Sequence, residues 1–468
     1  RQMLQRFRKI IPLLVVLVVA QWPASSGQTP NDANALLLQD ARLIVGDGSV
    51  VERGSILITG GLIAAVGEVA ADALPENTRI IKLQGKTVMP ALIDAHAHLG
   101  YEGHSGWGSR YYSRENLIDH LQRYAYYGFA AVFSAGSDPE DLVLALQRSQ
   151  RRREFEGARL LFAAGMAPPG QGPNNQFLSH AIALAEQTGM TILRGLETPP
   201  QARQMVKEVA AKKIPFIKIW VDDRGGSQQK LDPELYRAVI DEATENDIKV
   251  FVHQQFAEDM PDLLEAGVSG FLHGRIGDGF SEAIARQSKQ ADAFIIPNLG
   301  LAELRREAIG EDEFLRASIA DAVAERLTGI SSQRQSNPLR NTDAEAELQR
   351  GFARLLNAEV DIVLGTDAGA LPDHFFGYSG HRELEIFVRL GMTPMQALMA
   401  GTSKPARALG LHDMGLIEPG MSADLLVLDA NPLDNIRNTR TIARVYLRGN
   451  EVDRNAILEQ LVRRYDSQ

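Results

Sequence analysis

Two histidines at the end of an apolar stretch carry the strongest chemical signal in the sequence. The stretch Val88–Gly100 reads Val-Met-Pro-Ala-Leu-Ile-Asp-Ala-His-Ala-His-Leu-Gly, which predicts a buried strand over Met89–Ala95 followed by His96 and His98. Residues two apart on a strand point to the same side, so both imidazoles can reach one metal ion. Asp94 lies two residues before His96 and so points to the same side of the strand. We expect its carboxylate to hold a ligand ring by a hydrogen bond.

Further residues of ligand type stand inside other apolar runs or directly after them. Each alone has an ordinary explanation, because a strand histidine is usually a satisfied core residue and Gly-Thr-Asp can be a turn. If the runs are parallel strands of one barrel, however, their carboxyl ends meet at the face where barrel active sites form. The set adds His253 after Lys249–Val252, His273 after Gly270–Leu272, Asp367 after Asp361–Thr366 and Lys218 inside Phe216–Val221.

These residue types fit a site for two metal ions. Four neutral imidazoles suit zinc, nickel, cobalt or iron better than magnesium. Two dications side by side need an anionic bridge. In a buried site beside cations the pKa of Lys218 would fall, and the neutral amine could take up carbon dioxide to become a bidentate carbamate. A bridging hydroxide would be the nucleophile, and Asp367 would accept and later return its proton.

The surrounding elements predict a barrel. From Met89 onward strands alternate with helices, which is typical of a parallel (β/α)8 barrel. The predicted strands are Met89–Ala95, Ala130–Ala135, Arg159–Ala164, Phe216–Val221, Lys249–Val252, Gly270–Leu272, Ala293–Pro297 and Asp361–Thr366. The predicted helices include Tyr112–Tyr127, Asp138–Arg153, Pro200–Lys212, Pro233–Asn246, Ala257–Ala266, Ser281–Lys289, Ala344–Leu356, Glu383–Leu390 and Pro394–Leu409.

Short strands flank this alternation at both chain ends. They are predicted at Ala35–Val45, Ser55–Thr59, Leu62–Val66, Arg79–Leu83, Ala423–Asp429 and Ile442–Gly449. The simplest assembly pairs the two ends into one small β domain. Residues Leu301 to Asn341 are charged and interrupt the last repeat. We expect a solvated pair of helices there, with a lid over the barrel mouth as the alternative.

Composition excludes several classes of protein. The chain has 468 residues, of which 44% are hydrophobic and 23% charged, as in globular proteins, and its net charge of −10 disfavours nucleic acid as a partner. There is no cysteine, so disulfides and thiolate sites are excluded. Basic residues, the apolar run Ile10–Ala20 and the small residues Ala24–Ser26 predict a secretory signal over residues 1–26. A secreted or periplasmic protein follows; an uncleaved N-terminal anchor is the alternative.

As a set, the motifs resemble those of the amidohydrolase superfamily, in the branch of imidazolonepropionase-like hydrolases and metal-dependent prolidases. The resemblance covers about Ala35 to Gly449, through Val88–His98, Phe216–Ile219, Val250–His253, Gly267–Gly274, Leu364–Gly369, Gly391–Leu398 and Pro419–Asp429. It implies the barrel and a β-sandwich made from both chain ends. It also implies His96 and His98 on one metal, His253 and His273 on the other, a carboxylated Lys218 between them, and Asp367 as ligand and base.

The chain departs from the family pattern at several positions. Family members commonly have Gly where Ala91 stands, and Thr where Asn298 follows a proline. Many have His or Tyr at the position of Gln255, so no prolidase specificity carries over. Deaminases of the superfamily often have Glu where this chain has Phe256, which argues against a mononuclear deaminase. Residues in the loops after the strands are candidates to bind substrate, namely Arg110, Arg224, Gln255, Arg275 and His381.

The sequence therefore predicts a binuclear metal amidohydrolase. The expected division is 1–26 signal peptide, 35–88 β-sandwich, 89–412 barrel and 413–456 β-sandwich. The cofactors would be two divalent ions, most simply zinc, and the substrate a small-molecule amide or a dipeptide. A prolidase-like metallodipeptidase and a mononuclear deaminase or cyclic-amide hydrolase are the alternatives among enzymes. A non-catalytic binding protein on the same barrel is disfavoured by the full ligand set. No membrane partner is expected after signal cleavage, and a homo-oligomer is left open.

Overall fold

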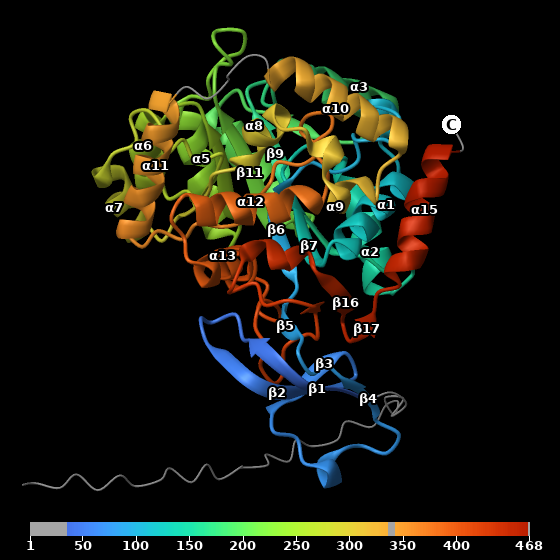
Figure 1. The fold of residues 1–468 in the computed structure, drawn as a ribbon. Coiled ribbons are helices and arrows are strands. Elements are labelled where there is room, and N and C mark those ends of the chain that lie inside the picture. Colours follow the sequence, from blue (N-terminus) through green and yellow to red (C-terminus); the bar gives the residue numbers. More distant parts are fainter. Residues whose placement is uncertain (1–34, 336–341, 467–468) are drawn as a thin grey trace, which may run out of the picture.

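The computed structural model describes residues 35–335 and 342–466. The predicted signal segment, residues 1–26, and the end of the predicted insertion, residues 336–341, lie outside the described residues. Among the helices that are described, none is both long and apolar enough to cross a membrane. The chain forms an α/β structure in which helices surround parallel strands, with further strands on one side of that body (Figure 1).

The central strands pair in parallel, as the strand and helix alternation predicts. One sheet has the order β10 (Leu193–Gly195), β9 (Ala164–Ala167), β11 (Phe216–Val221), β12 (Lys249–Gln254), β13 (Gly270–Leu272) and β14 (Phe294–Ile296). A second has β6 (Leu92–Ala97), β7 (Phe129–Ser134) and β8 (Arg159–Phe162). Most of their residues are buried, which is typical of parallel strands covered by helices.

The predicted strand Asp361–Thr366 is not a regular strand in the structure. Isolated parallel bridges, Ile295 to Ile362 and Ala97 to Ala368, and backbone hydrogen bonds such as that from Val363 to Ile295 join this segment to β14 and β6. At Leu364 the pairing is irregular: its backbone N–H donates to the carbonyl of Ala400 at 2.7 Å, outside the neighbouring strands. The segment nevertheless lies between β6 and β14, as its position in the predicted barrel requires.

The helices follow the predicted order, but the predicted helix Pro394–Leu409 is divided into two, and the predicted helix Glu383–Leu390 already begins at Tyr378. Ser113, Thr198 and Ser281 cap three helices through side-chain oxygens. Two helices were not predicted, α3 and α15. The α-helices are α1 (Arg114–Tyr126), α2 (Glu140–Arg151), α3 (Asn175–Thr188), α4 (Pro199–Ala211), α5 (Pro233–Glu245), α6 (Met260–Ala266), α7 (Glu282–Gln290), α8 (Gly300–Glu303), α9 (Glu313–Arg316), α10 (Asp321–Gln335), α11 (Thr342–Asn357), α12 (Tyr378–Arg389), α13 (Pro394–Ala400), α14 (Ser403–Ala408) and α15 (Arg454–Asp466). Short 3-10 turns include η2 (Ser109–Tyr111), η5 (Ile309–Glu311) and η6 (Ile436–Arg440).

Strands from both chain ends form one mixed sheet. Its order is β17 (Asn450–Glu451), β16 (Ile442–Leu447), β15 (Leu425–Leu428), β5 (Thr87–Pro90), β1 (Leu36–Ile44), β2 (Val50–Thr59) and β3 (Leu62–Gly67), with β4 (Arg79–Lys82) beside β1. The predicted strand Met89–Ala95 is thus divided: β5 pairs with β1 and β15, while β6 pairs with β7. The division falls at Ala91, whose N–H donates to the carbonyl of Asp424, directly before β15.

Candidate active site

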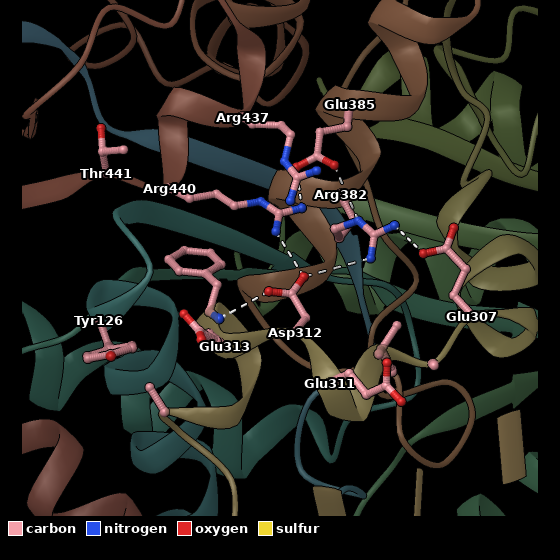
Figure 2. A pocket seen from close by; sticks show the side chains of 14 residues that line it. Tyr126, Glu307, Glu311, Asp312, Glu313, Arg382, Glu385, Arg437, Arg440 and Thr441 are labelled. Atoms are coloured by element: carbon pink, nitrogen blue, oxygen red, sulfur yellow. Dashed lines mark hydrogen bonds and ion pairs between the residues drawn. The ribbon is translucent and has the colours of Figure 1, made fainter. Parts of the chain in front are cut away.

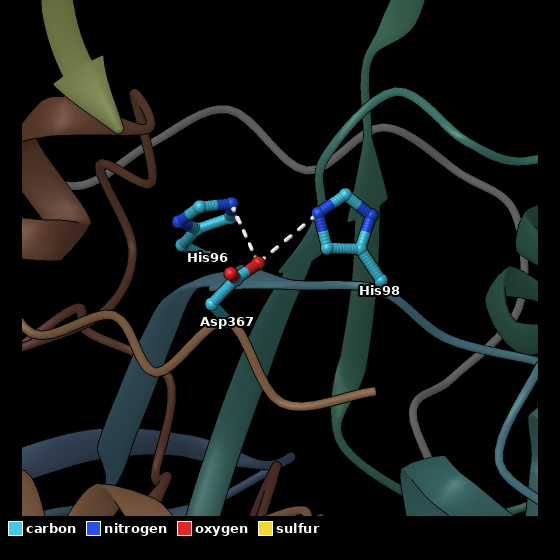
Figure 3. Close-up of side chains that lie close together, drawn as sticks. All are labelled: His96, His98 and Asp367. Atoms are coloured by element: carbon cyan, nitrogen blue, oxygen red, sulfur yellow. Dashed lines mark ion pairs between the residues drawn. The ribbon is translucent and has the colours of Figure 1, made fainter. Parts of the chain in front are cut away.

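Two histidines and an aspartate meet at the end of β6. Nε2 of His96 and Nε2 of His98 each lie 3.2 Å from Oδ1 of Asp367. All three side chains are buried, and their ligand atoms lie within 4.8 Å of one another (Figure 3). We call His96, His98 and Asp367 the first group.

The far side of each histidine ring in the first group is anchored by a polar side chain. Nδ1 of His96 donates to Oδ1 of Asn298 at 3.1 Å, and Nδ1 of His98 shares a hydrogen bond of 2.7 Å with Oγ of Ser137. Hydrogen bonds of this kind fix the orientation of a ligand ring. The prediction that Asp94 holds a histidine ring is wrong, because its carboxylate accepts a hydrogen bond from the backbone N–H of His96 instead.

Asp94 instead joins the two strand ends that carry the first group. Its Oδ1 accepts the N–H groups of His96 and Thr366, both at 3.1 Å, and its Oδ2 accepts hydroxyls of Tyr124 at 2.7 Å and Thr366 at 2.6 Å. Burial raises the pKa of Asp94 to about 6, against the opposing effect of these hydrogen bonds. Asp367 follows Thr366 directly, so the Asp94 network fixes where its carboxylate lies.

Three polar residues at the site have left-handed backbones. Asp367 has a φ of 59°, His273 of 68° and Asn298 of 52°. Non-glycine residues adopt this region at a cost of roughly 1–2 kcal/mol each, and such residues concentrate at functional sites. Each one ends or follows a strand segment, so the turn directs its side chain into the same space.

His253, His273 and Lys218 form a second group beside the first. Nε2 of His273 lies 3.4 Å from Oδ2 of Asp367, so this carboxylate contacts both groups. The ring of His273 lies 4.7 Å from that of His96 and 4.9 Å from that of His253, between centroids. The structure therefore brings the four predicted histidines to one place.

Lys218 is the most unusual member of the second group. Its side chain is fully buried inside β11, and among the described residues its Nζ has no hydrogen-bond partner. Burial lowers the pKa of Lys218 to about 7, against the charge of Asp367 and with that of Arg224. A neutral amine, the form that can react with carbon dioxide, is therefore accessible near neutral pH.

His253 is turned toward a carboxylate that the sequence did not single out. Its Nε2 lies 2.7 Å from Oδ2 of Asp222, which directly follows β11. Burial acts to raise the pKa of Asp222, but hydrogen bonds from His253 and the N–H of Arg224 lower it to about 2. Burial lowers the pKa of His253 to about 3, so its ring is neutral at physiological pH.

The polar atoms of the first group are arranged as ligands of a cation rather than as hydrogen-bond partners of one another. The backbone N–H of His273 donates to Oδ1 of Asn298 at 3.3 Å, which identifies that atom as oxygen, so Nδ1 of His96 must be the donor to it. Burial lowers the pKa of His96, so its Nε2 carries a lone pair. It faces the carboxylate of Asp367, and neither Nε2 nor Oδ1 has a hydrogen-bond partner among the described residues. Two acceptors 3.2 Å apart repel unless a positive charge lies between them. The donor set therefore fits a divalent metal ion.

The candidate substrate residues have different positions. Arg224 and Arg275 lie near the second group, since the charge of each lowers the pKa of His253. The guanidinium of Arg224 is engaged with Asp222 at 3.3 Å and with the carbonyl of Gly172 at 2.8 Å. Gln255 donates to Oδ1 of Asp223 at 2.7 Å.

Two of the candidate substrate residues contact other parts of the molecule. Arg110 lies on the exposed turn η2, over the ring of Tyr111. The structure does not bring His381 to the two groups. It lies inside α12, where its ring nitrogens are bound to Oγ1 of Thr439 and the carbonyl of Tyr127. The prediction assumed a loop after Asp367, but the chain has already entered a helix at Tyr378.

Sequence reasoning missed Asn298, Ser137 and Asp222 as anchors of the histidine rings. The signal was present, because Asn298 follows β14 by two residues and Asp222 follows β11 directly, at the same strand ends as the ligand-type residues. Ser137 gives no such signal, since it lies three residues beyond β7.

A large polar pocket lies elsewhere, between the insertion, α12 and η6 (Figure 2). It has a volume of about 900 Å³. Its partly exposed charges pair with one another: Arg382 with Glu307, and Arg440 with Asp312 and Glu385. This network fastens the insertion to the body of the protein, so we assign the pocket a structural part and look for chemistry at the two groups.

Comparisons with known proteins agree with this choice. The model of the amidohydrolase family matches residues 87–452. An imidazolonepropionase of Geobacillus kaustophilus is 28% identical, over 82% of this chain and 85% of its own. The crystal structure of a putative prolidase from Bifidobacterium longum is 25% identical, covers 92% of this chain and 99% of its own, and has a TM-score of 0.67. A Xaa-Pro dipeptidase with bound methionine shares the fold, with 22% identity over 89% of this chain and 99% of its own, and a TM-score of 0.67.

Proposed function

The chain belongs to the amidohydrolase family, and on that premise we propose that it hydrolyses the amide bond of a small molecule or dipeptide at a site for two metal ions. The family and its imidazolonepropionase relatives support a hydrolase of carbon–nitrogen bonds. One observation carries the proposal: Nε2 of His96 faces Oδ1 of Asp367, acceptor against acceptor, with neither atom otherwise bonded among the described residues. That arrangement suits a bound cation.

In this proposal the two groups hold one ion each. His96 and His98 would hold the first, His253 and His273 the second, and Asp367 lies against both groups. Zinc is the simplest choice for a set of imidazoles. When bound, such ions polarise a carbonyl and acidify a water molecule.

Lys218 would supply the anion between the two ions. Its neutral Nζ would add to carbon dioxide, forming one carbon–nitrogen bond and releasing one proton, to give a carbamate. The buried position of Nζ and the pKa of about 7 for Lys218 support this step.

The residues of the chain would then handle the proton. Burial acts to raise the pKa of Asp367, but its polar contacts, among them the hydrogen bond with His98, hold that pKa below the ordinary range, so the carboxyl is ionised. A carboxylate at this position can accept a proton from the attacking water and pass it to the leaving nitrogen. The Asp94 network and the left-handed backbone of Asp367 would keep the carboxylate aimed at the substrate.

We also infer that the parallel strands close into a barrel of eight. Support comes from the two isolated bridges, which link β14 to Ile362 and β6 to Ala368. On the other side, β8 runs into β9 after one residue, and β9 pairs with β11. The predicted boundaries at 88/89 and 412/413, and the packing of the sheet of the chain ends as a β-sandwich, stay predictions of the same kind.

A prolidase-like dipeptidase is the second candidate. The structural similarity to the putative prolidase, which covers 92% of this chain, favours it. Screening the metal-loaded protein against N-acyl amino acids, dipeptides with and without C-terminal proline, and cyclic amides tests both candidates. Hydrolysis of any amide supports the proposal, and preference for Xaa-Pro selects the second candidate. No turnover of any amide by protein that holds its metals would contradict both.

Export is a separate proposal, drawn from the sequence of the first 26 residues. Cleavage would fall near Ser26, after the apolar run Ile10–Ala20. N-terminal sequencing of protein from the native compartment tests it. A mature chain that retains Ile10–Ala20 would indicate an anchor instead.

A further inference from the structure

We infer that Asp222 is a positioning residue for the metal site, which anchors the ring of His253 through Nε2 and thereby fixes the orientation in which this histidine faces the second ion. The inference rests on the proposed metal site. It concerns a residue outside the set of ligands that the family resemblance implies, at a strand end where the chain reads Val221-Asp-Asp-Arg.

The contact between the two side chains decides where the proton of the ring lies. Oδ2 of Asp222 and Nε2 of His253 are 2.7 Å apart, and both side chains are at most 7% exposed. An ionised carboxylate can only accept hydrogen bonds. A lone pair on Nε2 at this distance would face another lone pair, so Nε2 must carry the hydrogen. With Nε2 engaged by Asp222, Nδ1 is the ring nitrogen left for a metal ion, which binds only the neutral imidazole.

Asp222 is itself held in place. Its Oδ1 accepts the backbone N–H of Arg224 at 2.7 Å, and the guanidinium of Arg224 lies 3.3 Å from Oδ2. Arg224 in turn donates to the carbonyl of Gly172 at 2.8 Å. These contacts fix the position of the Asp222 carboxylate. The loop after β11, which carries Asp222, therefore sets the orientation of the His253 ring.

The first group is built the opposite way. His96 donates from Nδ1 to Asn298 and presents Nε2 to Asp367. His253 donates from Nε2 to Asp222 and is left with Nδ1 as its lone-pair nitrogen. A hydrogen bond from the second nitrogen to a carboxylate orients a metal-binding histidine and raises its basicity. Asp222 would therefore do for the second group what Asn298 does for the first.

The direct test is the tautomer of His253 in the metal-free protein, read from ¹⁵N chemical shifts of histidine-labelled protein without substrate. The chain has 10 histidines, and a His253→Gln variant assigns the signal. We expect the Nε2–H tautomer at His253 and the Nδ1–H tautomer at His96. An Nδ1–H tautomer at His253 would overturn the inference whether or not the protein proves to be an amidase.

The second test is metal affinity, measured for zinc by competition with a chelator. Asp222→Ala should weaken the second ion on the order of 10- to 100-fold and leave His253 as a mixture of tautomers. Asp223→Asn is the matched control, because the neighbouring carboxylate bonds to Gly225 and Gln255 and should leave affinity unchanged. If Asp222→Ala does not fold, Asp222→Asn replaces it, and a smaller but measurable weakening is expected. Parental affinity together with an unchanged tautomer in the folded variant would contradict the inference.

Discussion

The first and second groups of the candidate site occupy the ends of parallel strands, yet they are held differently. In the first group, neutral partners anchor the rings, and one carboxylate, Asp367, faces both of them. In the second group an ionised carboxylate orients His253, and a buried amine, Lys218, has no partner among the described residues. The rings of the first group are thus held by hydrogen bonds to neutral side chains, whereas the second group depends on the charge states of Asp222 and Lys218.

The largest effect expected from this difference is that of Lys218→Ala. Removing the amine removes the proposed anionic bridge, so the variant should lose the ion of the second group, keep that of the first, and lose activity to background. Short carboxylic acids should restore part of the activity by replacing the carbamate. Lys249→Ala is the control, because that lysine lies at the start of β12 and donates to Ala408.

Metal analysis and activity assays of the two lysine variants check this prediction. A Lys218→Ala protein that binds both ions as the parent does would show that the lysine is no bridge. A high-resolution map with both metals and an unmodified amine would lead to the same conclusion.

Asp367→Asn tests the carboxylate that contacts both groups. The amide oxygen can still bind a metal weakly but cannot accept a proton near neutral pH. We expect most of the metal to be retained and kcat to fall by about 10²- to 10⁴-fold, the usual cost of a lost general base. Asp361→Asn, at the start of the same segment and paired with Lys404, is the control. Parental turnover in a metal-loaded Asp367→Asn variant would refute the proton-transfer role.

Removing an anchor from the first group should have an intermediate effect. Asn298→Gly removes the amide without straining the left-handed backbone, and Ser137→Ala removes the hydroxyl beside His98. Each should weaken metal binding by about 10- to 100-fold. Ser179→Ala, whose hydroxyl bonds within its own helix, is the control. Chelator competition measures the change, and affinities equal to that of the control would mean that the rings need no anchors.

The smallest effect concerns stability and pH. Glu383 on α12 accepts the N–H groups of Leu299 and Gly300, directly after Asn298. Burial raises the pKa of Glu383 to about 8, despite these hydrogen bonds. In the unfolded chain the group ionises near its ordinary pKa of about 4.3. The folded state therefore holds the proton over the interval between these values, and its stability falls as pH rises through it.

Glu383→Gln should remove that part of the pH dependence. Urea unfolding of parent and variant at pH 5 and pH 8.5 measures the change. If the free energy of unfolding changes by the same amount between these two pH values in both proteins, Glu383 is already ionised in the folded state.

Much of the site could be predicted from the sequence because its residues obey the parity and position rules of strands. Asp367, His253 and His273 each stand at the end of an apolar run, and the structure brings them together with His96 and His98. The parallel order of the strands follows from the same alternation. In the sheet of the chain ends, the pairing of the two termini was anticipated, but the division of Met89–Ala95 between two sheets was not.

What the sequence could not give is the direction of polar side chains that act on the ligands. The alternation of side chains along a strand predicts that Asp94 lies on the same side as the histidines. It cannot distinguish a hydrogen bond to a ring from one to the backbone. Asn298 and Asp222 become anchors only because turns bring their side chains back onto neighbouring rings, and no periodicity encodes that. His381 was misplaced because a helix begins three residues before it.

The metal content of the purified protein tests the central claim most directly. Elemental analysis of protein reconstituted with zinc, after removal of excess metal, should give about two ions per chain, from the two-metal geometry proposed here. Their removal by a chelator should abolish amide hydrolysis, and their return should restore it. One ion or none per folded chain would contradict the two-metal account.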